Sequence, residues 1–200
     1  MTGRPLPGVL RNDQGVTVVE FALIAPVLLT MLMGLMDLAY NMYTIQMLQG
    51  AIQTAARKST IEGASANSTA IDGVVTTAVH TIAPSATLTF ARKAYSNFSN
   101  ANRPEDYDDA NTNGTCDNGE IFEDANGNGT WDLDPGQTGF GGARDAVLYT
   151  VIVNYERPFP VFAFIPGQSS TYTLSVNTVL RNQPYGLQNG GSAPSTGNCT

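Results

Sequence analysis

The sequence predicts an α+β protein built on one long N-terminal helix, and three patterns indicate this fold class. An apolar run of helical length lies near the N-terminus. Two segments repeat apolar residues at helical spacing, and three later stretches alternate apolar and polar residues as strands do. We therefore expect a small antiparallel sheet that packs on the long helix.

The apolar run covers residues 16–36, where every residue except Glu20 is apolar, small, threonine or proline. About 20 such residues cross a bilayer as a helix, so the run predicts a transmembrane segment that Asp37 closes. A carboxylate inside the hydrocarbon is costly unless it is paired, so Glu20 calls for a partner. If the chain is cut after Gly15, the amine of a neighbouring subunit's Val16 can serve as that partner.

The helix is expected to continue beyond the membrane to residue 58. Apolar residues recur there at steps of three and four with glutamines between them, which predicts a stem whose one face packs on a soluble domain. Arg57 and Lys58 suit a helix C-terminus. Residues 16–58 are thus one transmembrane and stem helix.

Residues 1–15 form a leader with two arginines, Arg4 and Arg11. Positive charge on this side of the apolar run predicts a single-pass topology with a cytoplasmic N-terminus and an exported C-terminal part. The apolar run is also compatible with an ordinary signal peptide or with an anchor that is never processed.

The exported part is expected to be one α+β domain over residues 59–187, followed by a flexible tail over residues 188–200. Residues 67–82 predict a second, short helix, and residues 87–91, 147–155 and 171–180 predict strands. His80 is expected on the helix surface. The proline-bounded connection R-P-F-P-V-F-A-F-I-P-G is expected to cap the core, the alternative being a loop that contacts a partner or the membrane.

An acidic repeat with a period of fifteen residues lies in an insertion over residues 105–142. Each copy matches the ligand spacing of an EF-hand-like calcium loop, in which alternate oxygens and one backbone carbonyl surround the ion and glycine permits the sharp turn. The first loop offers Asp109, Asn111, Asn113, Thr115, Asp117 and Glu120. The second offers Asp124, Asn126, Asn128, Thr130, Asp132 and, more distantly, Asp134.

The second loop departs from the pattern at its twelfth place, where Pro135 stands. Asp134, Glu123 or Glu120 can supply the missing acid, or this loop binds weakly. Only three residues separate the loops, which leaves no room for the paired helices of an EF-hand domain. The alternative is a pair of solvated turns without metal, since Asn, Asp and Gly favour turns in any case.

Two cysteines, Cys116 and Cys199, lie in the exported part, where an oxidising compartment favours a disulfide over two free thiols. The formal net charge of −7 argues against nucleic-acid binding. The chain offers no nucleophile–base pair, zinc ligand set or phosphate loop, so we do not expect an enzyme.

The N-terminal motifs resemble a known family. The order G-V-T-V-V-E-F before a long apolar helix is similar to the processing site of type IV pilins, and E-F-A-L-I-A-P-V-L-L with Gly34 and Asp37 resembles the TadE-like pseudopilins of tight-adherence (Flp/Tad) pilus systems. The resemblance covers residues 14–57. It implies cleavage between Gly15 and Val16 by a prepilin peptidase, with Glu20 as the matching glutamate.

The resemblance also implies a minor subunit or assembly component that works with other pilins and the pilus machinery. The large extra domain argues against the main filament subunit, because the major Flp pilins are very short. The alternative function is a membrane-anchored calcium-binding surface or adhesion module that is not processed as a pilin. Glu20 favours the pseudopilin, because a simple anchor has no use for a buried carboxylate.

Overall fold

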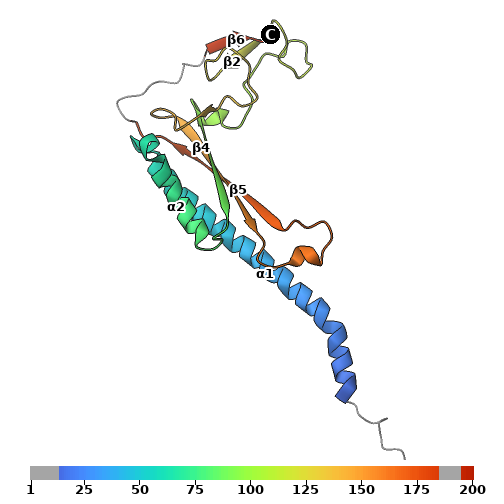
Figure 1. Ribbon diagram of the computed structural model, residues 1–200. Coiled ribbons are helices and arrows are strands. Elements are labelled where there is room, and N and C mark those ends of the chain that lie inside the picture. Colours follow the sequence, from blue (N-terminus) through green and yellow to red (C-terminus); the bar gives the residue numbers. More distant parts are fainter. Residues whose placement is uncertain (1–13, 185–194) are drawn as a thin grey trace, which may run out of the picture. The chain divides into compact units, whose positions relative to one another are not determined.

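The computed structural model describes residues 14–184 and 195–200, so most of the expected leader and the first part of the expected tail lie outside the described residues. The α+β class is confirmed by a long helix, a short second helix and small antiparallel sheets (Figure 1). The helices are α1 (Gln14–Ser59) and α2 (Ser68–His80), with short 3-10 helices η2 (Ala64–Asn67), η3 (Phe98–Asn100) and η4 (Val161–Ala163). The strands are β1 (Thr87–Tyr95), β2 (Ile121–Asp124), β3 (Gln137–Thr138), β4 (Ala146–Glu156), β5 (Thr171–Arg181) and β6 (Ser195–Asn198).

The chain forms two compact units. The first, which we call the anchor unit, contains Met1–Met42 and Arg157–Ser170. The second, the sheet unit, contains Tyr43–Glu156 and Thr171–Thr200.

In the anchor unit, α1 carries the apolar run and continues through Pro26. Within the described residues, α1 is the one helix that is long and apolar enough to cross a membrane. Its large side chains face outward, and Leu23 and Val27 are 74% and 71% exposed. Such a surface needs lipid or a partner around it, which fits a membrane anchor.

The segment Arg157–Ser170 is fixed to α1 by a buried ion pair. Arg157 Nη1 donates to Asp37 Oδ2, and the two side chains are 12% and 7% exposed. Asn41 Nδ2 also donates to Asp37 Oδ2, at 3.3 Å. The backbone N–H of Arg157 donates to the carbonyl of Ser170 at 2.9 Å, so the two ends of the segment meet.

The sheet unit is centred on a four-stranded antiparallel sheet of order β3-β1-β4-β5. Its central strand β4 alternates strictly: Val147, Tyr149, Val151, Val153 and Tyr155 are buried, and the residues between them are half-buried. The three expected strands are therefore present as β1, β4 and β5. The two-residue β3 at the edge is too short to show a period of two in the sequence.

The two helical parts of the sheet unit supply the other side of the core. Leu48, Ile52, Ala55 and Ala56 of α1 are buried, as are Ile71, Val75 and Val79 of α2. These residues recur at helical spacing, so α2 and the second half of α1 each bury one face. From Leu48 onward the stem stripe seen in the sequence is thus a core face, whereas Leu38 and Met42, the first apolar residues of that stripe, are 56% and 58% exposed.

Asp72 of α2 is a polar centre of this core. Both of its carboxylate oxygens accept hydrogen bonds from Arg92 of β1, at 3.2 and 2.5 Å, and Oδ1 also accepts from the Tyr149 hydroxyl at 2.6 Å. The Arg92 guanidinium lies 4.2 Å from the centre of the Tyr149 ring. Burial, followed by the Asp72 hydrogen bond, raises the pKa of Tyr149, so its hydroxyl stays a donor.

The structure differs from the expected tail at Ser195–Asn198. These residues form β6, which pairs antiparallel with β2 in a separate two-stranded sheet. Gly197 lies against the ring of Phe122, where an added Cβ would come within 2.4 Å of ring carbons. A stretch rich in Gly, Ser and Asn hides such a strand, because its pairing depends on a distant partner and not on its own apolar pattern.

Replacing Asp72 with Ala should lower the free energy of unfolding by about 3 kcal/mol, because the largely buried Arg92 loses its counter-charge. Tyr149→Phe removes a single hydrogen bond and should cost about 1 kcal/mol. Chemical denaturation of the detergent-solubilised chain measures both, with the exposed Glu62→Ala as the neutral control. Equal, small effects for all three variants would contradict a polar centre at Asp72.

Candidate functional site

The expected processing residues lie in the first turns of α1. Gly15, Val16 and Glu20 are all exposed in the single chain. A helical Glu20 on the outer surface of the anchor is available to a charge on another molecule. The geometry of one chain is therefore compatible with an intermolecular pairing of Glu20.

The first acidic loop is closed by its own side chains. Asp109 accepts hydrogen bonds from the backbone N–H groups of Asn113 and Gly114, at 3.1 and 2.9 Å. Asn113 Oδ1 accepts from the Thr115 N–H at 2.9 Å. Hydrogen bonds from the side chains of Asn111 and Asn113 hold the pKa of Asp117 below its usual range. The donors and acceptors of the loop thus converge on its inside.

The second acidic loop repeats these contacts one period later. Asp124 accepts from the N–H groups of Asn128 and Gly129, at 3.0 and 2.8 Å, and Asn128 Oδ1 accepts from the Thr130 N–H at 2.7 Å. Asn126 and Asn128 donate their amides to Asp132. Burial raises the pKa of Asp124, but hydrogen bonds from the backbone N–H groups of Gly129, Asn128 and Gly127 outweigh this effect. The pKa of Asp124 is therefore lowered overall. The two loops are therefore equivalent in their local geometry.

The acid at the twelfth place of the first loop is Glu120. Its Oε1 accepts from the N–H of Ala110, at the second place of the loop, at 3.0 Å. Its Oε2 accepts from the N–H of Asp117, at the ninth place, at 2.9 Å. Glu120 therefore bridges the two arms of the loop.

Glu105 makes the same two contacts in the second loop. Its Oε1 accepts from the N–H of Ala125 at 2.8 Å, and its Oε2 accepts from the N–H of Asp132 at 2.9 Å. Ala125 and Asp132 are the second and ninth residues of that loop. Glu105 thus occupies, for the second loop, the position that Glu120 has in the first.

Asp134, an expected ligand of the second loop, is engaged elsewhere. One carboxylate oxygen accepts from the Tyr95 hydroxyl at 2.9 Å, and the other pairs with Lys93 of β1. This contact ties the acidic insertion to the four-stranded sheet. Burial, with the Asp134 hydrogen bond, raises the pKa of Tyr95 to about 12. Sequence reasoning missed Glu105, although it precedes Glu120 by one full period of fifteen and carries the same side chain.

Burial raises the pKa of Glu105 above its ordinary value of 4.5, and the charges of Asp132 and Asp124 add to the effect, while its backbone donors oppose it. The residue is only 4% exposed. Trp131 fixes the same stretch, because its Nε1 donates to the Glu105 carbonyl at 2.9 Å and its ring packs edge-on against Tyr107. A buried, ionisable carboxylate among other acids favours the binding of either a proton or a cation.

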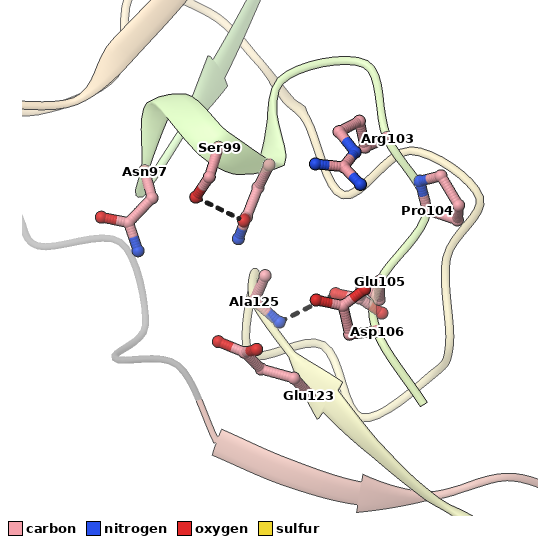
Figure 2. Close-up of a pocket in the computed structure, with 9 residues that line it drawn as sticks. Asn97, Ser99, Arg103, Pro104, Glu105, Asp106, Glu123 and Ala125 are labelled. Carbon is pink, nitrogen blue, oxygen red and sulfur yellow. Dashed lines mark hydrogen bonds between the residues drawn. The ribbon is translucent and has the colours of Figure 1, made fainter. Parts of the chain in front are cut away.

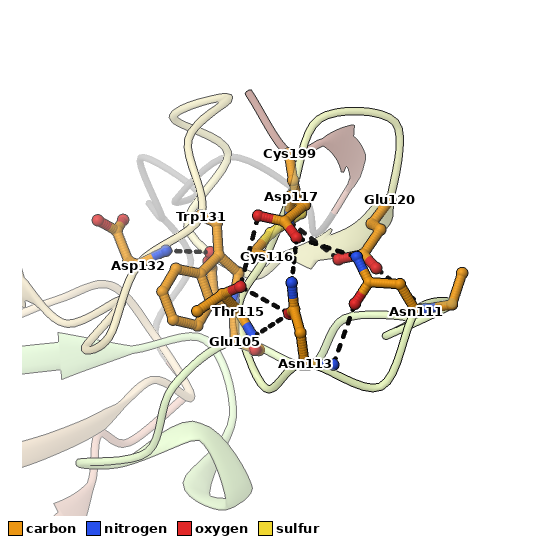
Figure 3. The surroundings of a disulfide bond; sticks show 11 residues. Glu105, Asn111, Asn113, Thr115, Cys116, Asp117, Glu120, Trp131, Asp132 and Cys199 are labelled. Carbon is orange, nitrogen blue, oxygen red and sulfur yellow. Dashed lines mark hydrogen bonds between the residues drawn. A yellow bond between two sulfur atoms is a disulfide. The ribbon is translucent and has the colours of Figure 1, made fainter.

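A disulfide joins the first loop to the residue that follows β6 (Figure 3). Cys116 and Cys199 have Cα atoms 5.4 Å apart and are separated by 83 residues in the sequence. The N–H of Cys199 donates to the Glu120 carbonyl at 2.8 Å, and its carbonyl accepts from Gly119. The C-terminus is therefore held beside the residue that closes the first loop.

These loops would hold calcium through a mixture of carboxylate oxygens, asparagine side-chain oxygens and backbone carbonyl oxygens. Among residues 14–184 and 195–200, no three His, Cys, Asp or Glu side chains are arranged to hold a metal by themselves. The expected ligand set relies equally on asparagine oxygens and on the Thr115 and Thr130 carbonyls, as calcium loops do. The amides of Asn113 and Asn128 now donate to Asp117 and Asp132, so they would rotate to present oxygen to an ion.

A small polar pocket opens beside the second loop (Figure 2). Its volume is about 150 Å³, below the roughly 300–1,000 Å³ of ordinary small-molecule sites. The pocket is lined by Asn97, Ser99, Asn100, Arg103, Pro104, Glu105, Asp106, Glu123 and Ala125. Its size suits water or an ion better than an organic substrate.

Part of the chain is similar to a known protein family. Residues 15–57 match the family described as TadE-like protein, which covers the apolar and stem parts of α1. No curated protein and no solved structure matches the chain. A TadE-like segment suggests a protein that is associated with a tight-adherence pilus and that interacts with other components of the pilus. The match does not extend to the sheet unit beyond residue 57.

The disulfide should contribute about 3–5 kcal/mol to stability in the chain-entropy model, because it closes a loop of 83 residues. Non-reducing peptide mapping should recover Cys116 and Cys199 in one linked peptide. Cys116→Ser and the double variant Cys116→Ser/Cys199→Ser should show the same loss of stability. Two free thiols in protein from an oxidising compartment would refute the pairing.

Proposed function

The chain carries a TadE-like segment, and from this premise we propose that it is a minor pseudopilin or assembly component of a Tad-type (Flp) pilus. The observation that carries the proposal is that the matched residues 15–57 coincide with the membrane-competent helix α1. The N-terminus stays in the cytoplasm, α1 crosses the bacterial inner membrane once, and the sheet unit is exported. Its partners are other pilins, the assembly machinery and a prepilin peptidase.

The role of Glu20 in this proposal is assembly. It lies among apolar residues, is exposed in the single chain and costs energy in lipid unless it is paired. Cleavage after Gly15 creates a positive amine at Val16, and pairing between that amine and Glu20 of a neighbouring subunit removes the cost. Mutual pairing of this kind favours assembly over isolated subunits.

We also propose that the two acidic loops bind calcium and thereby stabilise the exported domain. What supports this is the equivalence of Glu105 and Glu120, each bridging the second and ninth residues of one loop. Residues 105–134 contain no lysine or arginine, so no positive side chain from within the stretch balances its acids. The proposed ligands are those expected from the sequence, with Glu105 in the place of Asp134.

The competing proposal is a calcium-binding surface or adhesion module that is anchored but never processed. It shares the loops and the helix and differs only at the N-terminus. The mature N-terminal residue therefore separates the two functions. The chain is proposed to have no enzymatic activity in either case.

The mature chain should begin at Val16. Intact-mass analysis of protein extracted from membranes should show the loss of residues 1–15 in cells that have the prepilin peptidase, and the full mass in cells that lack it. A full-length mass in both strains would favour the unprocessed surface module.

Glu20→Gln should leave insertion into the membrane unchanged or improved, because it removes a charge from the apolar run. Pilus numbers counted by electron microscopy should nevertheless fall severalfold, because the pairing with a neighbouring amine is lost. Glu62→Gln, an exposed acid outside the apolar run, is the matched control. Normal piliation with Glu20→Gln would remove the assembly role.

Calorimetric titration of the full chain should find two calcium sites, and Glu105→Gln should weaken the second by about tenfold or more while sparing the first. Asp134→Asn is the matched control, because its carboxylate is held by Lys93 and Tyr95, so both sites should remain. The melting temperature should rise with calcium, since an ion that binds only the folded chain stabilises it.

The pH dependence of stability and of calcium binding provides a second test of the role of Glu105. Its raised pKa means that the folded, metal-free chain holds this proton more tightly than the unfolded chain, so its contribution to stability is present at low pH and is lost as pH rises. Calcium requires the ionised form, so the second site should weaken on acidification and Glu105→Gln should flatten this dependence. No calcium binding at millimolar concentration would mean that the loops are ordinary turns.

A further inference from the structure

The segment Arg157–Ser170 exposes an apolar surface. Val161 is buried, but Phe162, Phe164 and Ile165 are 38%, 57% and 43% exposed. The sequence favoured a cap over the core here, and the exposure of these three side chains contradicts that expectation. Residues 158–170 contain no charged residue. An exposed apolar, uncharged loop indicates a contact surface.

The position of this segment along α1 is fixed by the buried ion pair between Arg157 and Asp37. The apolar run of residues 16–36 spans about 31 Å as a helix, which matches the roughly 30 Å of the hydrocarbon layer. Asp37 therefore stands at the boundary between hydrocarbon and headgroups. Tyr40 lies one turn further, where aromatic side chains favour the interface.

We propose that Phe162, Phe164 and Ile165 rest in the bilayer surface, so that the anchor unit contacts lipid twice, through α1 and through this loop. The lipid interface is the surface that covers this loop, because the loop belongs to the same compact unit as the spanning helix. The loop is also held by Arg157 at Asp37, the residue that ends the apolar run. Phenylalanine and isoleucine gain from burial at the boundary of headgroups and acyl chains. The proposal depends on α1 spanning the membrane.

Site-specific fluorescence tests the contact in the full chain. The sequence has two cysteines and the structure joins them, so Phe164→Cys introduces a single free thiol for an environment-sensitive dye. The labelled chain is reconstituted into vesicles of phosphatidylethanolamine and phosphatidylglycerol. These vesicles carry lipids with a spin label either near the headgroup or near the bilayer centre.

The Phe164 label should be quenched more by the shallow spin label than by the deep one. Its shallow quenching should exceed that of Ser170→Cys, an exposed polar position of the same segment, by about twofold or more. Arg157→Gln in the Phe164→Cys background should reduce the quenching, because the loop is then no longer held at Asp37. Unchanged quenching in that variant would overturn the positioning by the ion pair.

Leu28→Cys, in the middle of the apolar run, distinguishes a failure of the loop contact from a failure of the membrane span of α1. Deep quenching at residue 28 without quenching at residue 164 would overturn the loop contact alone, whereas no quenching at residue 28 would overturn the span itself. A blue-shifted Phe164 label that lipid spin labels do not quench, and that depends on the protein-to-lipid ratio, would mean that another copy of the chain covers the loop. That result would also overturn the proposal.

Discussion

A carboxylate that leaves water must receive an opposite charge or several hydrogen-bond donors, and this requirement organises the described part of the chain. Asp72 meets it with Arg92 and Tyr149, which ties α2 to two strands. Asp37 meets it with Arg157, which ties a loop to the end of the apolar run. In each unit, a paired acid thus joins segments that are far apart in the sequence.

The acidic loops meet the same requirement in a different way. Glu105 and Glu120 receive two backbone N–H groups each and no lysine or arginine from their own stretch. Backbone donors satisfy the oxygens but do not balance the charge, which a divalent cation would do. This contrast with Asp72 and Asp37 is the physical reason why we propose calcium binding at the acidic loops and not in the core.

Much of the fold follows from local patterns. The apolar run, the stem stripe and the alternation of β4 are properties of neighbouring residues, and α1 and β4 appear within two residues of their expected bounds. β6 and the position of Glu105 are not local properties. β6 exists through its pairing with β2 and through the adjacent disulfide to Cys116, and Glu105 lies 19 residues before the loop that it closes.

The expectation for the exposed loop was wrong for a related reason. Its phenylalanines predict burial inside the protein if water is the only solvent. A chain with a membrane-competent helix can meet two solvents, water and lipid. Val161 is buried against protein, and Phe164 is left outside it. The apolar pattern therefore indicates which side chains avoid water and not whether protein or lipid covers them.

We propose that this chain serves a tight-adherence pilus through its TadE-like segment. The most direct measurement is the number of surface pili on cells from which the chain has been deleted, with and without a plasmid that restores it. We expect deletion to remove most pili and the restored chain to return them. Unchanged pili after deletion would contradict a role in the pilus and leave the anchored surface module as the better description.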